Sequence, residues 1–465
     1  MALSVITEPL NLPRRFTAPG AARRPKLLFL VTEDWYFCSH RLPAARAARV
    51  AGFDVVVATR VRAHGDQICD EGFALRPIGW RRRGDGVLGA GRAISEIAGL
   101  YRAEQPDLVH HVALKSVLFG GIALRRAFPA PESAPVAIDS IMGLGSRFSA
   151  ASFAARLRRP PLGIALRLAA ARERGWVIVQ NPEDREVLTT LGIAPRRIVM
   201  IRGSGVDCNH FRPLPDPDAT TVTVALVSRM LRDKGVLDAV AAIRLLRGRG
   251  LPLELLLAGP TDPDNRGSLA AETLISLGSA DHGIEWLGPV ADVRAVWRRA
   301  AIAVLPSTYG EGVPKALLEA AACARPIVAS DVAGCREVVR PGDTGILVHP
   351  RDVKGLADAI AALACDPVRR RAMGRAGRAL IERDLIEAAV HQQAGLTGTH
   401  DLPATGNVAG DNGTRASGRL QQRLRHAFAI GRGQHGNRRP TPHGPDVGNR
   451  AEPLDFWVGG GQRKQ

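Results

Sequence analysis

Short apolar runs alternate with stretches of helical periodicity along most of the chain. Lys26–Thr32 is such a run, and helical spacing over Asp34–Val50 leads to a second run, Asp54–Thr59. A strand, a helix and a strand in this order predict a parallel crossover unit, because parallel neighbours need a long return connection. The alternation continues as far as Ile201, so we expect one α/β domain over residues 26–205.

The alternation stops around Gly205–Pro215 and then starts again. Further strands are expected at Val222–Val227, Leu253–Ala258, Ile284–Leu287, Ile302–Leu305 and Pro326–Ala329, with helical stretches between them. This pattern predicts a second α/β domain over residues 216–390. The expected fold class is therefore α/β, with two Rossmann-like parallel-sheet domains and a ligand cleft between them at the carboxyl ends of the strands.

The two ends of the chain lack this patterning. Residues 1–25 contain arginines but no apolar stretch typical of a signal peptide, so we expect a flexible N-terminus. From about Gly395 onward Gly, Arg, His, Asn and Pro dominate, and few apolar side chains remain to offset the entropy of ordering. We expect residues 395–465 to form a basic, disordered tail; translation outside the ancestral reading frame is an alternative origin for it.

Composition narrows the class of protein. The chain has 465 residues, of which 45% are apolar and 23% charged, values that are ordinary for a soluble globular protein. Its six cysteines include no CxxC pair, so we expect a reducing, cytoplasmic compartment and no metal site. Since no apolar run approaches the roughly 18 residues of a spanning helix, we expect no transmembrane segment.

The net charge of +18 favours anionic partners, although a genome rich in GC would also enrich arginine. Nucleic-acid binding would need aromatic side chains among the basic ones, and only 5% of residues are aromatic, so no specific nucleic acid is expected. Phe153–Arg174 mixes apolar residues with arginines, which can keep their charge in water while apolar atoms enter a membrane interface. This pattern favours contact with an anionic membrane surface, and an ordinary surface helix would share it.

The segment Tyr309–Glu319 (YGEGVPKALLE) carries the clearest chemical signal. It follows an expected strand and opens a helix at Pro314, where free N–H groups and the positive helix end would bind a phosphate. Its glycines let the backbone approach a ligand closely, and the Glu319 carboxylate can accept hydrogen bonds from a polyol. The candidate donor-site residues here are Gly310, Glu311, Gly312, Val313, Pro314 and Glu319.

Two cations follow the first strand of the second domain. Arg229 and Lys234 lie in Val227–Gly235 (VSRMLRDKG), directly after Ser228. An arginine fork and a lysine point charge are a common pair for binding a diphosphate, and they can neutralise a leaving group without a metal ion. Alone, this spacing would also fit a solvated turn.

Polar segments at strand ends of the first domain would form the acceptor side. We expect Asp34–Pro43 to be a polar loop, Asp107–Ser116 to end a strand, and Gly143–Ser146 to be a flexible loop. The candidate acceptor-binding residues in these segments are His40, Arg41, His110, Lys115, Gly143 and Gly145. A loop or core histidine without a chemical role is the alternative for each histidine.

The string from Glu311 to Glu319 resembles the E-x7-E signature of retaining glycosyltransferases of family 4, which have the two-domain GT-B fold. The resemblance continues through Ala320–Val339 and Gly342–Val348. It implies that Glu311 contacts the transferred sugar and that Glu319 binds the ribose hydroxyls of the nucleotide. It also implies that backbone amides near Gly312 hold diphosphate or sugar.

The family's Arg-x4-Lys string is similar to Arg229–Lys234, and it implies that these cations bind the diphosphate with no cofactor or metal. Ser39–Pro43, Lys115–Gly120 and Gly143–Gly145 look like the bacterial branch that adds sugars to polyprenyl-diphosphate-linked oligosaccharides. Family members usually carry a glycine-rich loop after the first strand, whereas this chain has Glu33–Tyr36, a departure that the branch shares.

The resemblance implies a retaining enzyme that moves a hexose or N-acetylhexosamine from a nucleoside-diphosphate sugar, with UDP favoured, to a lipid-linked saccharide. Assembly of cell-surface polysaccharide, O-antigen or glycoprotein glycan would be its context, at the inner face of the cell membrane. Three alternatives stay open: a sugar-nucleotide epimerase of the same fold, a basic nucleic-acid-binding protein, and a defunct enzyme. A defunct enzyme stays open because family 4 domains usually end with a helix that crosses back to the first domain. Ala376–Gln393 begins such a helix, but the sequence after it diverges from the family pattern.

Overall fold

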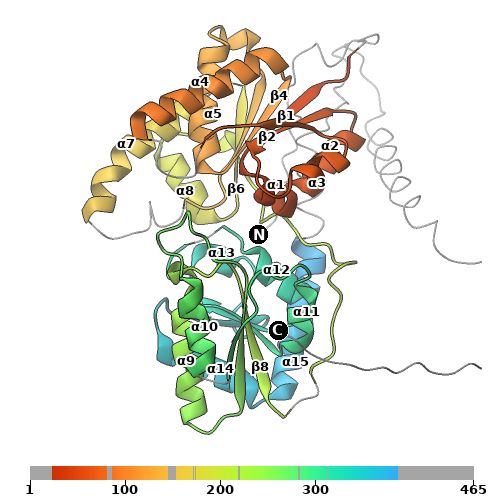
Figure 1. Cartoon of the computed structure of the whole chain (residues 1–465), viewed down its shortest axis with the longest axis vertical. Helices are drawn as coiled ribbons and strands as arrows, with labels where there is room; N and C mark the ends of the chain where they lie inside the picture. Colours follow the sequence, from red (N-terminus) through yellow and green to blue (C-terminus); the bar gives the residue numbers. More distant parts are fainter. Residues whose placement is uncertain are drawn as a thin grey trace, which may run out of the picture. The chain divides into compact units, whose positions relative to one another are not determined.

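The computed structural model describes residues 23–80, 86–144, 153–170, 172, 174–217, 220–280, 283–310 and 312–385. Its strands form two parallel sheets, one of seven strands and one of six (Figure 1). This confirms the expected α/β class with two Rossmann-like domains, while the exact domain boundaries stay predictions. Glu311, Gly145 and both expected flexible ends lie outside the described residues.

The N-terminal sheet has the strand order β3-β2-β1-β4-β5-β6-β7. Its strands are β1 (Lys26–Glu33), β2 (Asp54–Arg60), β3 (Ala74–Pro77), β4 (Leu108–Val112), β5 (Val136–Ser140), β6 (Gly175–Val179) and β7 (Ile198–Met200). The order reverses between β1 and β4, which pair directly. In a doubly wound sheet this reversal is where ligands bind, so the segments after β1 and β4 are the ones to examine.

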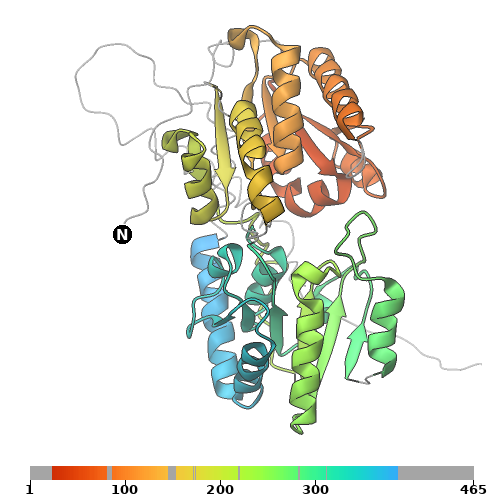
Figure 2. The ribbon, with the colours of Figure 1, turned by 90° about the vertical axis from the view of Figure 1, so that its left-hand side faces the viewer.

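Helices cover both faces of the N-terminal sheet (Figure 1, Figure 2). They are α1 (Asp34–His40), α2 (Leu42–Val50), α3 (Gly65–Asp70), α4 (Gly86–Glu104), α5 (Leu114–Ala127), α7 (Phe153–Ala170) and α8 (Pro182–Thr190). Phe29 of β1 packs with α1, α2 and α3, while Leu28 and Leu30 pack with α4 and α5. The strands are apolar on both faces because both faces are covered.

The C-terminal sheet has the order β10-β9-β8-β11-β12-β13. Its strands are β8 (Val222–Val227), β9 (Leu253–Ala258), β10 (Ile284–Trp286), β11 (Ile302–Leu305), β12 (Ile327–Ser330) and β13 (Gly345–Val348). The helices are α9 (Val236–Gly248), α10 (Ala271–Ala280), α11 (Arg294–Arg299), α12 (Lys315–Ala322), α13 (Ala333–Arg336), α14 (Val353–Ala364) and α15 (Pro367–Leu380), then a π turn over Ile381–Leu385. Here the order reverses between β8 and β11, which places the segments after these two strands at the ligand-binding edge.

Two segments differ from the sequence-based expectation: Asp34–Pro43, expected as a loop, and Gly267–Leu277, expected as a helix. Asp34–Pro43 is not a loop, because α1 occupies most of it and a break at Arg41 separates α1 from α2. Helix α10 begins only at Ala271, since the preceding residues form a hydrogen-bonded loop in which Gly267 accepts from the Arg232 amide. Among the helices in the described ranges, none is long and apolar enough to cross a membrane.

Candidate functional site

The segment after β8 is bound tightly to the segment after β11. The Thr308 amide donates to the Asp233 carbonyl at 3.0 Å. Gly235 has a φ of +70°, and a Cβ at this position would lie 2.0 Å from the Pro306 carbonyl oxygen. Only glycine fits so close an approach in this conformation, and the contact holds Lys234 beside the end of β11.

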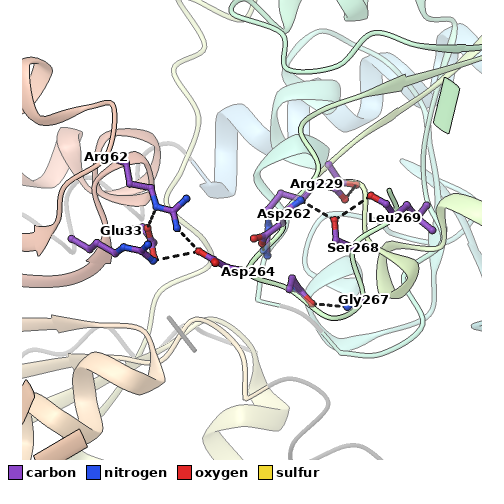
Figure 3. Close-up of polar contacts among 11 residues, drawn as sticks. Glu33, Arg62, Arg229, Asp262, Asp264, Gly267, Ser268 and Leu269 are labelled. Atoms are coloured by element: carbon purple, nitrogen blue, oxygen red, sulfur yellow. Dashed lines mark hydrogen bonds and ion pairs between the residues drawn. The ribbon is translucent and has the colours of Figure 1, made fainter. Parts of the chain in front are cut away.

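Arg229 lies at the boundary between the two domains. Its Nη1 forms an ion pair with Asp262 (Figure 3). Its guanidinium lies 6.0 Å from the ring centroid of Trp35 in α1. Ser228, the neighbouring candidate, donates its hydroxyl to the Arg229 carbonyl at 2.9 Å. Arg229 is therefore held on one edge by a carboxylate of its own domain and is approached by an aromatic ring of the other domain.

The glycine-rich segment before α12 makes direct contact with the N-terminal domain. The Val313 amide donates to Gln180 Oε1 at 2.9 Å, so this amide is not free for a phosphate in this conformation, contrary to the expectation for the loop. A Cβ on Gly312 would lie 2.2 Å from the same oxygen and 2.7 Å from the Met142 carbonyl oxygen. Pro314 is the N-cap of α12, so the helix begins at Lys315, one residue later than expected. Gly312 thus allows the two domains to touch here.

Glu319 is buried on α12, only 8% exposed. Burial raises the pKa of its carboxyl to about 7, and Lys315, whose Nζ lies 3.6 Å away, opposes that rise. Lys315 also donates to the Ser39 carbonyl of α1 at 2.8 Å. A carboxyl with a pKa near neutrality can accept hydrogen bonds from hydroxyls when ionised and donate one when protonated.

Three acceptor-side candidates lie together near the ends of β1, β4 and β5. His40 stacks on Tyr36 with 4.2 Å between ring centroids, and burial lowers its pKa to about 3. Arg41 is buried and contacts Met142 Sδ, and burial lowers the pKa of its guanidinium. His110 lies inside β4, in the strand expected there, with Nε2 2.7 Å from the Ser140 hydroxyl.

Each of these three side chains has a buried nitrogen without a hydrogen-bond partner among the residues that the structure describes: His40 Nδ1, Arg41 Nε and His110 Nδ1. Burial, followed by the charge of Arg41, holds the pKa of His110 well below its ordinary value. The charges of Lys315, Arg41 and Arg229 likewise lower the pKa of His40. The structure therefore brings these acceptor-side residues close to the donor-side cations.

Two further candidates lie apart from this group. Lys115, at the start of α5, has its Nζ 5.3 Å from the ring centroid of Trp80 and 5.2 Å from that of Phe119. Gly143 adopts a φ of +96°, in a turn whose next amide, that of Leu144, donates to Asp184 at 3.1 Å. Lys115 is thus engaged with aromatic rings, and Gly143 shapes the segment after β5.

Sequence reasoning missed several residues that line this region: Trp35, Gln180, Asp262, Asp264 and Lys315. Lys315 stood within the motif, and its position four residues before Glu319 was the available signal. The other four make contacts over long sequence separations, such as Gln180 with Val313, and no local pattern marks them.

Comparisons with known proteins agree with this geometry. Residues 26–144 match the family model described as glycosyl transferase 4-like, and residues 221–366 match the one described as glycosyl transferases group 1. The alpha-maltose-1-phosphate synthase of Mycolicibacterium smegmatis is 35% identical over 43% of this chain and 57% of its own length. The N,N'-diacetylbacillosaminyl-diphospho-undecaprenol alpha-1,3-N-acetylgalactosaminyltransferase of Campylobacter jejuni is 27% identical over 56% of this chain and 68% of its own. The chain spans 17% to 68% of the lengths of the first curated relatives that it matches.

Solved structures share the fold. HepE of Anabaena in complex with UDP and glucose superposes with a TM-score of 0.63 at 18% identity, over 80% of this chain and 99% of HepE. Sucrose-phosphate synthase of Thermosynechococcus elongatus has a TM-score of 0.65 at 20% identity, over 87% of this chain and 100% of the synthase. The fold is GT-B, and the two matched models together span more than half of the chain, one over each sheet. The N-terminal domain is thus similar to glycosyl transferase 4-like domains, and the C-terminal domain is similar to those of group 1 glycosyl transferases.

Proposed function

We propose that this protein is a retaining glycosyltransferase that moves a hexose or N-acetylhexosamine from a UDP-sugar to a hydroxyl of a lipid-linked saccharide. The observation that carries the proposal is the position of Arg229, which follows a central strand of the C-terminal sheet and lies against α1 of the N-terminal domain. A cation at this edge meets a ligand held between the two domains. HepE, which shares the fold, binds UDP and UDP-glucose.

On the donor side, Arg229 and Lys234 neutralise the charge that develops on the diphosphate as it leaves. Glu319 accepts hydrogen bonds from the ribose hydroxyls, for which its buried position next to Lys315 is suited. Glu311 contacts the transferred sugar. The resemblance to retaining family 4 glycosyltransferases implies that the acceptor attacks from the face that the diphosphate leaves, so that the configuration is retained.

On the acceptor side, His40, Arg41 and His110 offer unpartnered nitrogen atoms near the donor cations. Gly143 and Gly145 shape the adjoining segment, and Lys115 lies at the start of α5. The relative from Campylobacter jejuni is named for an undecaprenyl-diphosphate acceptor. A lipid-linked acceptor of that chemistry is the one we propose here, in the assembly of a bacterial surface glycan.

Such an acceptor stays in the bilayer, so the enzyme must work at the inner face of the cell membrane. Ile164 and Leu168, one helical turn apart on α7, are 61% and 56% exposed, and Arg167 between them is exposed too. Apolar and basic side chains on one exposed helix suit an anionic lipid surface. Pelleting the protein with vesicles of anionic lipid, and its release by salt, would test this part.

The test of the activity is incubation with a panel of UDP- and GDP-sugars, with and without polyprenyl-diphosphate saccharides. We expect transfer or slow hydrolysis with at least one UDP-sugar, and loss of transfer in Glu311→Ala with the fold intact by circular dichroism. No binding, hydrolysis or transfer with any donor would exclude the proposed activity. Full activity of Glu311→Ala would exclude the role of that residue.

A further inference from the structure

The loop Pro260–Ser268, between β9 and α10, is built by its own hydrogen bonds. The Asn265 amide donates to the Asp262 carbonyl at 2.7 Å, and the Asp262 amide donates to the Ser268 hydroxyl at 2.8 Å. The Gly267 amide donates to Asn265 Oδ1 at 3.0 Å. The loop therefore has one defined shape, which fixes the positions of its two carboxylates, Asp262 and Asp264 (Figure 3).

This loop is also fastened to the segment that carries Arg229. The Met230 amide donates to the Pro260 carbonyl at 2.9 Å, and the Arg232 amide donates to the Gly267 carbonyl at 2.7 Å. The Leu269 amide donates back to the Met230 carbonyl at 2.9 Å. Any movement of the loop is thus transmitted to the donor-side segment.

Asp262 faces the donor side. Its side chain is 9% exposed, and it forms an ion pair with Nη1 of Arg229, whose side chain is 30% exposed. An arginine fork has further N–H groups, so a phosphate can bind the guanidinium while the carboxylate holds one edge. Asp262 would fix the direction of the fork and also place a negative charge near the bound diphosphate.

Asp264 faces the N-terminal domain. It forms ion pairs with Arg62 and, at 3.3 Å, with Arg60 (Figure 3). Both arginines also lie 3.5 Å from Glu33, whose side chain is 4% exposed at the end of β1. Partly exposed ion pairs contribute little to stability, so this cluster is better suited to form and break during domain movement than to hold the fold together.

Helix α1 links the ion pairs of Arg62 to Arg229. The Asp34 carboxylate accepts from the backbone amides of Arg62 at 2.6 Å and His64 at 2.9 Å. The next residue, Trp35, is the one whose ring lies beside Arg229. Arg229 and the interdomain ion pairs are therefore linked twice, by the loop Pro260–Ser268 in the C-terminal domain and by α1 in the N-terminal domain.

We propose that the loop Pro260–Ser268 couples donor binding to domain closure: Asp262 is a positioning residue for Arg229, and Asp264 is a clasp that holds Arg60 and Arg62. The inference rests on the proposed function, since Arg229 is assigned to the donor diphosphate there. With the clasp closed, α1 brings Trp35 against Arg229 and excludes water from the diphosphate.

The experiment compares Asp264→Asn and Asp262→Asn with a control, Asp358→Asn. Asp358 lies on α14, and its substitution removes an exposed ion pair with Arg249. UDP affinity is measured by calorimetry, and turnover by UDP release from the UDP-sugar that the donor panel selects. For Asp264→Asn we expect kcat to fall about 10-fold with the Kd for UDP unchanged, because closure and not binding is impaired. Asp264→Glu, which keeps the charge, should recover most of the loss.

For Asp262→Asn we expect kcat to fall while UDP binds several-fold more tightly, because a charge that repels the diphosphate is gone but Arg229 is less well oriented. A merely structural role would weaken both together. If the wild-type protein binds UDP and turns over but Asp264→Asn behaves like Asp358→Asn, the clasp is refuted and the proposed function stands. If Asp262→Asn loses UDP affinity and kcat in parallel, the positioning role is refuted. If the wild type neither binds UDP nor acts on any donor, the proposed function itself fails.

Discussion

The two sheets differ in where their buried polar side chains lie. In the N-terminal sheet they stand inside the strands: Thr59, His110, His111, Asp139 and Ser140. In the C-terminal sheet the buried polar strand residues are two hydroxyl side chains near strand ends, Thr223 and Ser330, and others such as Asp262 and Ser307 follow the strands. The C-terminal domain therefore keeps core and site separate, whereas the N-terminal domain combines them.

A buried hydrogen-bonded chain of three side chains in the N-terminal domain shows what it means to place polar residues inside the core. The Tyr101 hydroxyl lies 2.9 Å from His111 Nε2, and His111 Nδ1 lies 2.6 Å from Asp139 Oδ1. Burial lowers the pKa of His111, and the Asp139 carboxylate opposes that shift. In the neutral ring with its proton on Nδ1, the N–H donates to the carboxylate and Nε2 accepts from the Tyr101 hydroxyl. Every polar atom in such a core needs its partner, so substitutions there should cost stability before they change chemistry.

The largest expected effect tests that statement. Asp139→Ala leaves the N–H of His111 and the nearby Arg172 without their carboxylate, and it should destabilise the N-terminal domain by about 3–5 kcal/mol. Urea unfolding followed by circular dichroism measures it. Asp54→Ala, exposed at the start of β2, is the control and should change little. A loss below about 1 kcal/mol for Asp139→Ala would contradict the contrast between the two sheets.

In the C-terminal domain, substitution of a polar residue of the site should lower activity rather than stability. Arg229→Ala removes the cation assigned to the diphosphate and should lower kcat/KM about 100- to 1,000-fold, with little change in the unfolding midpoint. Arg249→Ala, which removes a more exposed positive charge outside the site (42% against 30% for Arg229), should keep wild-type kinetics. A large drop in stability for Arg229→Ala would show that this domain also builds its site into its core.

Glu319 is the exception in the C-terminal domain, because it is a buried ionisable group of the site. Its folded-state pKa of about 7 lies above the ordinary 4.5, so between these values the folded protein holds a proton that the unfolded chain lacks. Stability from this group is complete below pH 4.5 and is lost as the pH rises through 7.

Glu319→Gln should remove this dependence, so its stability relative to wild type should rise by up to about 3 kcal/mol between pH 4.5 and pH 8. Urea unfolding at several pH values in this window provides the measurement. Glu285→Gln, at an exposed glutamate paired with Arg299, is the matched control and should follow the wild-type curve. Parallel curves for Glu319→Gln and wild type would mean that the carboxyl is ionised in the folded protein.

The smallest expected effect concerns the contact between the domains. Gly312→Ala places a Cβ against Gln180 and the Met142 backbone, so the domains must part slightly, and kcat should fall about 10-fold with unchanged thermal stability. Gly99→Ala, which meets no atom within 4 Å on α4, should leave kcat unaltered. Equal kcat in both variants would show that this contact is not needed for turnover.

The sequence alone indicates the residues proposed for the C-terminal site, because they stand in one continuous string and at strand ends that apolar runs mark. It placed β8 (Val222–Val227) and β9 (Leu253–Ala258) at their observed bounds for the same reason. It failed at Asp34–Pro43, where polar side chains conceal a helix whose packing depends on Phe37. It could not show the pairing of Arg62 with Asp264, since these residues are 202 positions apart and meet only when both domains are folded.

The ion pairs of Asp264 have a consequence for recombination between related enzymes. Exchanging one whole domain with that of a relative would preserve each core but would mismatch this acidic loop with Arg60, Arg62 and Glu33. A chimaera that carries a foreign N-terminal domain should therefore fold and yet work poorly until the loop is exchanged with it. Over evolution, substitutions at these distant positions should be inherited together, as one compatibility determinant between two otherwise separable modules.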